Sequence, residues 1–359
     1  LQSAVAKMDD HVGRAAIISN GSPLFTGGTA SGESQIRRWL LENDLVEAII
    51  QMPNDLFYNT GISSFCWILS KNKRPERIGK IQLIDASGIC HKLRKPLGSK
   101  KNEFTPEDRE VITKLYCDFE ENEFSKIYNN TEFIYREYTV MQPLQRRYEI
   151  TDESIERLMQ SGVLSKLYDE AKVLELEEKG ENMTAKERTK LEDFKKSKQQ
   201  YDSILDALNA AKSEEKYMSP EAFLPVINKV LSDVDSKLVD KITDALSVMD
   251  KNAEIQREKK GKNKGEIIYD KDTKDTEIVK YDEDIEDYMA REVLPHIPDA
   301  KWFFEENLTA KKPVIKTGAE IPFTRCFYKY QKQAKSEDVA AKMAELMKEA
   351  GEIEKKLFG

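Results

Sequence analysis

Two short apolar segments joined by a turn-rich loop place the strongest constraint on how this chain can fold. Residues 46–52 (VEAIIQM) and 64–70 (SFCWILS) are rich in β-branched and aromatic side chains, and both are too short for helices. Such segments are typical of buried strands. The link between them cannot hold a crossover helix, so the two strands are predicted to run antiparallel.

The loop between these strands carries two adjacent aromatic residues where polar residues are usual. Pro53, Asn54 and Gly61 provide turn chemistry, whereas Phe57 and Tyr58 are aromatic. An aromatic pair on a loop at the end of a sheet is suited to stacking on a flat ligand such as a nucleobase. The alternative is that Phe57 closes the hairpin as part of the core, because apolar side chains are usually buried.

The surrounding pattern predicts an α/β sheet. Further strands are expected at residues 14–19 and 80–87, with helices at 34–42 and 105–121 and an extended segment at 133–150. Strands that alternate with helices favour a mainly parallel sheet, here ending in one antiparallel hairpin.

A glycine-rich turn imitates a nucleotide-binding loop. Gly27 and Gly32 have the spacing of a phosphate loop, but Glu33 stands where that loop needs a lysine. A carboxylate there would repel a phosphate. We therefore predict a tight turn that uses glycine's backbone freedom, and not a nucleotide triphosphatase.

Charge is unevenly distributed along the chain. The formal net charge is −8, which by itself argues against a freestanding nucleic-acid-binding protein. Between Lys71 and Lys101, however, ten basic residues stand against two acidic ones. Such a segment could neutralise DNA phosphates, although an ordinary solvated surface is the alternative. The candidate phosphate contacts are Lys71, Lys73, Arg74, Arg77, Lys92, Arg94 and Lys95.

From about residue 151 the pattern becomes helical and highly charged. We divide the chain into residues 1–150 (the sheet domain), 151–260 (a helical region), 261–335 (a small module of one hairpin and one helix) and 336–359 (a terminal helix). Apolar residues in the last segment recur at steps of four and three, which is the seam of a coiled coil. The seam predicts docking on a partner's helix, with folding back onto its own domain as the alternative. Its residues are Val339, Met343, Leu346, Ala350, Ile353 and Leu357.

The cysteines and the apolar segments bear on the compartment. The four cysteines have no paired spacing, which favours a reducing cytoplasm and predicts neither a disulfide framework nor a metal site. No apolar segment approaches the ~20 residues needed to cross a bilayer, so no membrane association is expected. The chain begins without methionine and without a signal peptide, as expected for a piece of a longer protein.

An ordered set of motifs resembles the later part of the methyltransferase (M) subunits of type I restriction–modification systems. The resemblance covers nearly the whole chain and is weakest at residues 152–260. It rests on residues 13–18 (GRAAII), 24–28 (LFTGG), 36–42 (IRRWLLE), 56–62 (LFYNTGI), 133–136 (FIYR), 139–144 (TVMQPL), 282–285 (DEDI), 291–300 (REVLPHIPDA) and 318–328 (GAEIPFTRCFY).

The resemblance implies a fold, an activity and partners. The fold would be the late part of a Rossmann-like methyltransferase sheet with an antiparallel edge hairpin, followed by a mainly helical C-terminal region. The activity would be N6-methylation of a flipped adenine in DNA, with S-adenosylmethionine as methyl donor. Phe57 is then the first choice for stacking on the base and Tyr58 the second. The implied partners are DNA, a specificity (S) subunit, a restriction (R) subunit and a second M subunit.

The sequence also departs from the family pattern. The Asn-Pro-Pro-Phe/Tyr motif that holds the target amine is absent, as is the glycine-rich donor-binding loop. In the family both precede the part resembled here, so this chain alone is expected to be inactive, with no catalytic residue of its own. One alternative is a non-catalytic helical scaffold with a degenerate α/β module. Another is a single-chain adenine methyltransferase with its own recognition domain.

Overall fold

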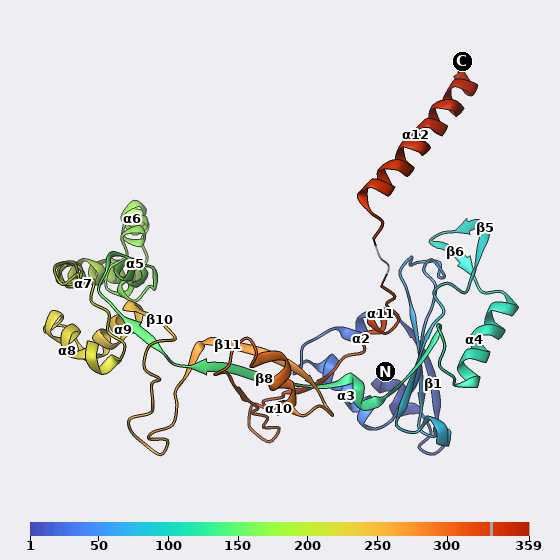
Figure 1. The fold of residues 1–359 in the computed structure, drawn as a ribbon, viewed down its shortest axis with the longest axis horizontal. Helices are drawn as coiled ribbons and strands as arrows, with labels where there is room; N and C mark the ends of the chain where they lie inside the picture. Colours follow the sequence, from blue (N-terminus) through green and yellow to red (C-terminus); the bar gives the residue numbers. More distant parts are fainter. Residues whose placement is uncertain (331–332, 359) are drawn as a thin grey trace. The chain divides into compact units, whose positions relative to one another are not determined.

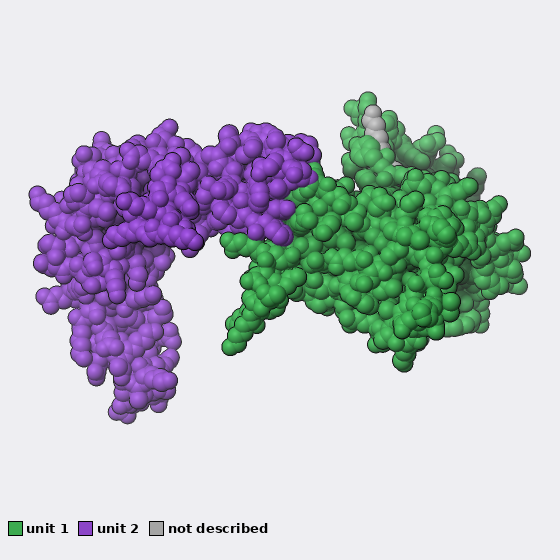
Figure 2. All heavy atoms as spheres, turned by 90° about the horizontal axis from the view of Figure 1, so that it is seen from below, with its two compact units in different colours: residues 1–137, 278–283, 305–359 green, residues 138–277, 284–304 purple. Residues whose placement is uncertain are grey.

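The computed structural model describes residues 1–330 and 333–358, which form two compact units. Unit 1 consists of Leu1–Glu137, Ile278–Glu283 and the described residues from Glu305 on. Unit 2 consists of Tyr138–Glu277 and Asp284–Phe304. Figure 2 colours the two units separately.

A five-stranded mixed sheet forms the centre of unit 1 (Figure 1). Its order is β1-β3-β2-β4-β7, in which only the β2–β4 pair is parallel. The mixed sheet confirms the predicted α/β class, and the β2–β3 pair confirms that the two strands run antiparallel. The prediction of a mainly parallel sheet that ends in this hairpin is wrong, because β3 lies between β1 and β2 and pairs antiparallel with both. The strands are β1 (Arg14–Ser19), β2 (Val46–Gln51), β3 (Phe65–Ser70), β4 (Lys80–Asp85) and β7 (Ser125–Asn129).

The carboxyl ends of three strands meet at one edge of this sheet. Ser19 of β1 and Gln51 of β2 both lie opposite Phe65 of β3, and Gln51 also lies beside Asp85 of β4. Therefore β1, β2 and β4 point the same way, and the loops that follow them share an edge. In open α/β sheets this is the edge at which ligands usually bind.

The helices α3 and α4 of unit 1 begin at residues whose side chains cap them. In α3 (Gly32–Glu42) the Ser31 hydroxyl accepts a hydrogen bond from the Ser34 amide at 3.1 Å. The glycine-rich turn is thus the entrance to a helix, in agreement with the predicted tight turn. In α4 (Pro106–Asp118) Thr105 and Asp108 form a reciprocal capping box. The remaining helices of this part are α1 (Gln2–Lys7), α2 (Ser22–Phe25), and the 3-10 turns η1 (Pro75–Arg77) and η2 (Asn130–Phe133).

The core of unit 1 includes a segment from much later in the chain. Trp67 and Leu83 are fully buried beneath α3, together with Ile321 and Phe323. The Arg37 side chain of α3 is also buried, and its Nε donates to the Ala319 carbonyl at 2.7 Å. These contacts involve β13 (Thr317–Ala319) and α11 (Phe323–Cys326).

Unit 2 is mainly helical from residue 152 to residue 246, as the apolar periodicity predicted. Its larger core joins Leu158, Ile204, Phe223 and Ile242, and α6 packs on α7 around a smaller one. The periodic segment 220–251 is divided into two helices and a short strand. The elements are α5 (Asp152–Gln160), η3 (Leu164–Lys166), α6 (Glu170–Lys179), η4 (Gly180–Asn182), α7 (Ala185–Ala210), α8 (Pro220–Val230), α9 (Ser236–Leu246) and β10 (Ser247–Met249).

The hairpin predicted near residues 266–281 is wrong. Residues Tyr269–Lys280 form a single strand, β11, which pairs with the extended segment β8 (Ile134–Pro143). The polar residues in the middle of this segment do not form a turn. They belong to the strand, because the long partner strand β8 lies beside them. The predicted short helix does form, as α10 (Ile285–Tyr288) followed by a π-helical turn, η5 (Met289–Val293). Nearby strands are β9 (Arg146–Tyr148) and β12 (Lys301–Phe303).

Candidate functional site

The aromatic loop, residues 53–63, follows β2 at the edge where three strands end. Asp55 adopts a left-handed conformation (φ 54°), and its amide donates to the Gly61 carbonyl at 3.3 Å. The Ser63 hydroxyl donates to Asn54 Oδ1 at 2.7 Å. These bonds fold the loop back on itself. A Cβ at Gly61 would come within 2.7 Å of the Asp55 carboxylate, so a larger residue there would displace that side chain.

The two candidate stacking residues differ in exposure. The Phe57 side chain is half-buried, and its backbone forms an isolated bridge with Thr60. Tyr58 is 60% exposed, and the Lys100 ammonium lies 5.2 Å from its ring centroid. Phe57 therefore combines partial anchoring with partial access, whereas Tyr58 offers the larger free surface. Base stacking by either residue stays a prediction.

A second ribbon, the hairpin β5–β6, is joined to the aromatic loop. It consists of β5 (His91–Leu97) and β6 (Lys100–Glu103), which are antiparallel. The Lys101 and Asn102 amides donate to the Asp55 carbonyl at 2.8 and 3.1 Å. The Ser99 amide donates to the Tyr58 carbonyl at 3.0 Å. The structure thus brings together the aromatic pair and part of the basic segment, which are separate features in the sequence.

The basic candidates on this hairpin are accessible. Lys92, Arg94 and Lys95 all lie on β5 and are exposed. Among the residues that the structure describes, no carboxylate forms an ion pair with any of the three. Their charges are available to an anionic partner, so phosphate contact by these three stays a prediction.

The other four basic candidates lie beyond β3, at the opposite edge of the sheet. Lys73 is buried and bonds to Asp44 at 2.5 Å and to the Lys80 carbonyl at 2.7 Å. Burial lowers its pKa, although the hydrogen bond to Asp44 and the charge of that carboxylate partly oppose this. A lysine with these internal partners is not available to DNA.

Arg77 is also buried, at 1% exposure. It lies 3.6 Å from the equally buried Glu47 carboxylate, and its guanidinium stacks on the Tyr116 and Phe119 rings. Burial lowers its pKa as well. We therefore correct the prediction for Lys73 and Arg77, because their side chains stabilise the fold. Lys71 is paired with Asp10, whereas Arg74 is exposed.

A cavity of 570 Å³ lies at the same edge as the aromatic loop. Polar groups of Asn20, Gln51 and Ser63 line one part of it, and aromatic rings of Phe65 and Phe323 line another. Gln51 Nε2 donates to the Ser63 hydroxyl at 3.4 Å. A partly apolar cavity with a few polar groups is suited to a small flat ligand.

Only some of the residues that line this cavity are recognisable in the sequence. Polar residues at the carboxyl end of a predicted strand, such as Asn20 and Gln51, are possible edge groups. No local pattern pointed to residues 320–325, which reach the cavity only through the long-range packing of α11.

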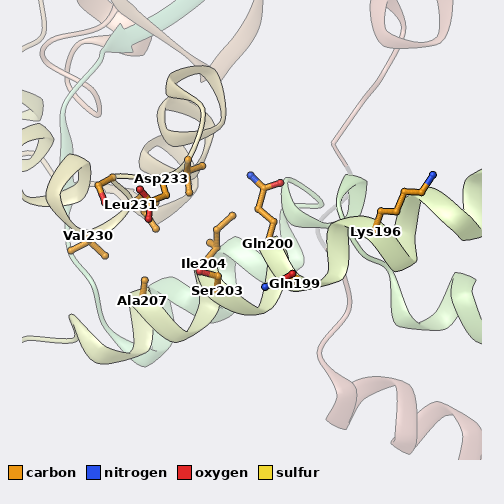
Figure 3. Close-up of a pocket in the computed structure, with 11 residues that line it drawn as sticks. Lys196, Gln199, Gln200, Ser203, Ile204, Ala207, Val230, Leu231 and Asp233 are labelled. Carbon is orange, nitrogen blue, oxygen red and sulfur yellow. The ribbon is translucent and has the colours of Figure 1, made fainter.

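Unit 2 contains a separate cavity of 340 Å³ (Figure 3). Ser203, Ile204 and Ala207 of α7 line it from one element, and Val230 and Leu231 line it from the end of α8. It includes none of the residues predicted to act on DNA.

The terminal helix α12 (Ser336–Phe358) has the predicted length and an uncovered apolar seam. Val339 is 54% exposed, Met343 and Leu346 are each 57% exposed, and Leu357 is 69% exposed. Ala350 and Ile353 lie in the same helix. The seam does not fold back onto the described part of its own unit to any large extent. What covers it stays a prediction.

Among the described residues, no helix combines the length and the apolar character needed to cross a membrane. Within the same residues, no cluster of histidine, cysteine and carboxylate side chains has the arrangement of a metal site.

Comparison with known proteins places the similarity in the first part of the chain. Residues 1–154 match the family model of N-6 DNA Methylase. The MjaVIII methylase subunit of a type I restriction enzyme from Methanocaldococcus jannaschii is 32% identical over 158 residues, which is 44% of this chain and 26% of that protein. The MjaVII methylase subunit from the same organism is 35% identical over 128 residues, or 35% of this chain and 21% of that protein.

A solved structure of a type I restriction–modification methyltransferase subunit from Streptococcus thermophilus is 29% identical to this chain. The similarity covers 34% of this chain and 24% of that one, with a TM-score of 0.29. The chain thus spans about a quarter of the length of the relatives that it matches. Within that range the resemblance predicted from the motifs is confirmed: this chain is similar to the methylase subunits of type I restriction enzymes, and its residues 1–154 match the N-6 DNA Methylase family.

Proposed function

We propose that this chain is part of the modification subunit of a type I restriction–modification system, and that the complete subunit methylates adenine N6 in DNA. The observation that supports this most directly is the joining of an aromatic loop and an exposed basic hairpin at the carboxyl edge of the sheet. Base stacking and phosphate binding are the two contacts that a base-flipping enzyme needs close together. The similarity to methylase subunits supports the same proposal.

In the proposed reaction the target adenine leaves the DNA stack, because its N6 atom cannot be reached within the duplex. Phe57 stacks on the extruded base, with Tyr58 as the second choice. Lys92, Arg94 and Lys95 hold the phosphates of the DNA backbone near the extruded base. Phosphate contact by the exposed Arg74 stays a prediction, whereas Lys71 is already paired with Asp10. The half-buried position of Phe57 supports its role, since an anchored ring keeps its orientation when the base arrives.

S-adenosylmethionine is the proposed methyl donor, but no residue of this chain is assigned to it. The glycine-rich turn at Gly27 does not form a donor cradle. Ser31 Oγ lies 2.0 Å from where a Cβ on Gly27 would stand, so the turn closes on its own helix cap. This turn therefore does not fit the donor, and we derive no catalytic step from it.

We further propose that the sheet is the late part of a Rossmann-like methyltransferase sheet. The common direction of β1, β2 and β4, with the antiparallel β3 inserted between β1 and β2, supports this arrangement. A cytoplasmic location is proposed as well. All four cysteines lie in the described part of the chain and are free, which suits a reducing compartment.

The proposed partners follow from the exposed seam of α12. An apolar seam on a charged helix is the pattern of coiled-coil packing, and we propose that it binds a helix of the specificity subunit. A second M subunit and a restriction subunit would join the same complex. A non-catalytic scaffold is the competing function, because an uncovered seam on a helical protein would serve that role equally well.

A methyl-transfer assay distinguishes the methyltransferase subunit from the non-catalytic scaffold. The full-length gene product is co-expressed with the neighbouring specificity gene, and transfer from labelled S-adenosylmethionine to adenine in duplex DNA is measured. The proposal expects transfer that disappears when the specificity partner is omitted. Stoichiometric binding of the partner without any transfer would refute the enzymatic function and favour the scaffold.

The stacking role has its own test. Phe57→Ala should lower the rate of methyl transfer far more than it weakens donor binding, since the ring touches the base and not the donor. Trp39→Ala is the control, because Trp39 is 42% exposed on α3 and lies outside the proposed site. Equal losses of transfer and of donor binding in Phe57→Ala would contradict stacking.

A further inference from the structure

The hairpin β5–β6 is hydrogen-bonded to the aromatic loop through β6 and through the turn between its two strands. Besides the backbone bonds from Ser99, Lys101 and Asn102, the Asn102 side chain donates from Nδ2 to the Asn54 carbonyl at 2.9 Å. Asn102 is thus bonded to the loop twice, through its amide and through its side chain. These bonds join residues that are 41 or more positions apart in the sequence, so they fix the loop against a separate element.

The same hairpin is anchored at its base. His91 Nδ1 lies 2.8 Å from Asp108 Oδ2, and Asp108 belongs to the capping box of α4. Gly98, in the turn between β5 and β6, has φ 63°, and a Cβ there would lie 2.9 Å from the Tyr58 carbonyl oxygen. One end of the hairpin is therefore tied to α4, and the other packs closely on the aromatic loop.

We propose that the hairpin β5–β6 positions the aromatic loop, and that Asn102 is a positioning residue for Phe57 and Tyr58. Lys92 and Arg94 lie on one strand of the hairpin, and the bonds to the loop start from the other strand and the turn. A phosphate bound by the first strand therefore restrains the loop through the second. Binding of the DNA phosphates and stacking on the base then both depend on the hairpin β5–β6. This coupling rests on the proposed function, whereas the positioning of the loop does not.

Hydrogen exchange on the full-length gene product tests the positioning directly. Asn102→Ala should accelerate exchange in peptides that cover residues 54–58 and 98–102 by about three- to tenfold, the effect of losing one such bond. Asn43→Ala is a matched control, because Asn43 Nδ2 donates to the Trp39 carbonyl at 2.8 Å in the same unit. The control should leave those peptides unchanged. Unchanged exchange in Asn102→Ala would overturn the inference.

A second variant acts on the same contact from the other side. Gly98→Ala places a methyl group against the Tyr58 carbonyl and strains the left-handed turn, so it should loosen the same two peptides. If both variants leave exchange in the rest of unit 1 unchanged, misfolding is excluded as the cause. Loosening that spreads over the whole unit in both variants would overturn a local positioning role.

Methyl transfer provides the functional readout. Asn102→Ala should lower kcat about tenfold or more while KM for DNA changes less than threefold, since the cations of β5 remain in place. A larger effect on KM than on kcat would refute positioning of the aromatic pair. If the wild-type complex transfers no methyl group at all, the proposed function fails, but the exchange experiment still decides whether the hairpin positions the loop.

Discussion

The structure separates the basic residues of one sequence segment into two classes, which charge removal should distinguish. Lys92, Arg94 and Lys95 are exposed on β5, whereas Lys73 is buried with its ammonium bonded to Asp44. The perturbation is the triple substitution Lys92→Ala, Arg94→Ala and Lys95→Ala in the full-length gene product with its specificity partner. The comparison is the single substitution Lys73→Met, which also removes positive charge.

The magnitude follows from counterion release. Each phosphate contact contributes about 0.9 to the slope of log K against log salt concentration, so the loss of three contacts lowers the slope by about 2.7. Over a fourfold increase in salt, a slope difference of that size amounts to roughly 40-fold in affinity. The wild type should therefore lose about 40-fold more affinity than the triple variant as salt is raised from about 50 to about 200 mM.

Equilibrium DNA binding at several salt concentrations measures this slope. Lys73→Met should leave the slope unchanged and should instead lower the free energy of unfolding by about 1–3 kcal/mol, since Asp44 loses a buried partner. A triple variant with the wild-type slope would refute the assignment of phosphate contacts to β5. A reduced slope in Lys73→Met would refute the distinction between the two classes.

Three further outcomes are expected. The hydrogen bond that His91 donates to the Asp108 carboxylate raises the pKa of His91, so this pair stabilises the fold fully below pH about 6.5, and the contribution is lost as pH rises through the folded-state pKa. Unfolding measured from pH 6 to pH 9 should show this loss in the wild type and not in His91→Ala, and parallel curves would contradict it. Leu83→Ala should cost about 2–5 kcal/mol in chemical denaturation, because Leu83 is fully buried in the sheet core, and a cost below about 1 kcal/mol would contradict that packing. The double substitution Met343→Glu and Leu346→Glu should abolish co-purification of the specificity subunit. It should change the free energy of unfolding by less than about 0.5 kcal/mol, because both side chains are exposed. Retained co-purification would show that α12 is not part of the interface.

The sequence predicted the strands and helices whose formation depends on neighbouring residues. The runs at 46–52 and 64–70 became β2 and β3, because their side chains are apolar and β-branched and the loop between them is short. Thr105 was expected to begin a helix and does so through a capping box. The strand β11 was missed for the opposite reason. Its residues are polar and charged, and they are extended because β8 lies beside them.

The candidate site shows the same division. Phe57, Tyr58 and the basic segment were recognisable as residue types, but their proximity was not, since the hydrogen bonds from Ser99 and Asn102 join parts of the chain about 40 residues apart. The residue type also does not distinguish Lys73 from Lys92. A lysine in a sequence looks the same whether its side chain pairs with an internal carboxylate, as in Lys73, or is exposed to water, as in Lys92.

The sequence by itself determined the strands β1 to β4, most helices, the amphipathic seam of α12 and the family resemblance, all of which depend on neighbouring residues or on an ordered set of short motifs. The tertiary structure decided which cations are free, which elements complete the cavity, and how the aromatic loop is held. Burial and long-range hydrogen bonding depend on which distant chain segments pack against each other. A pattern of neighbouring residues does not show which segments these are.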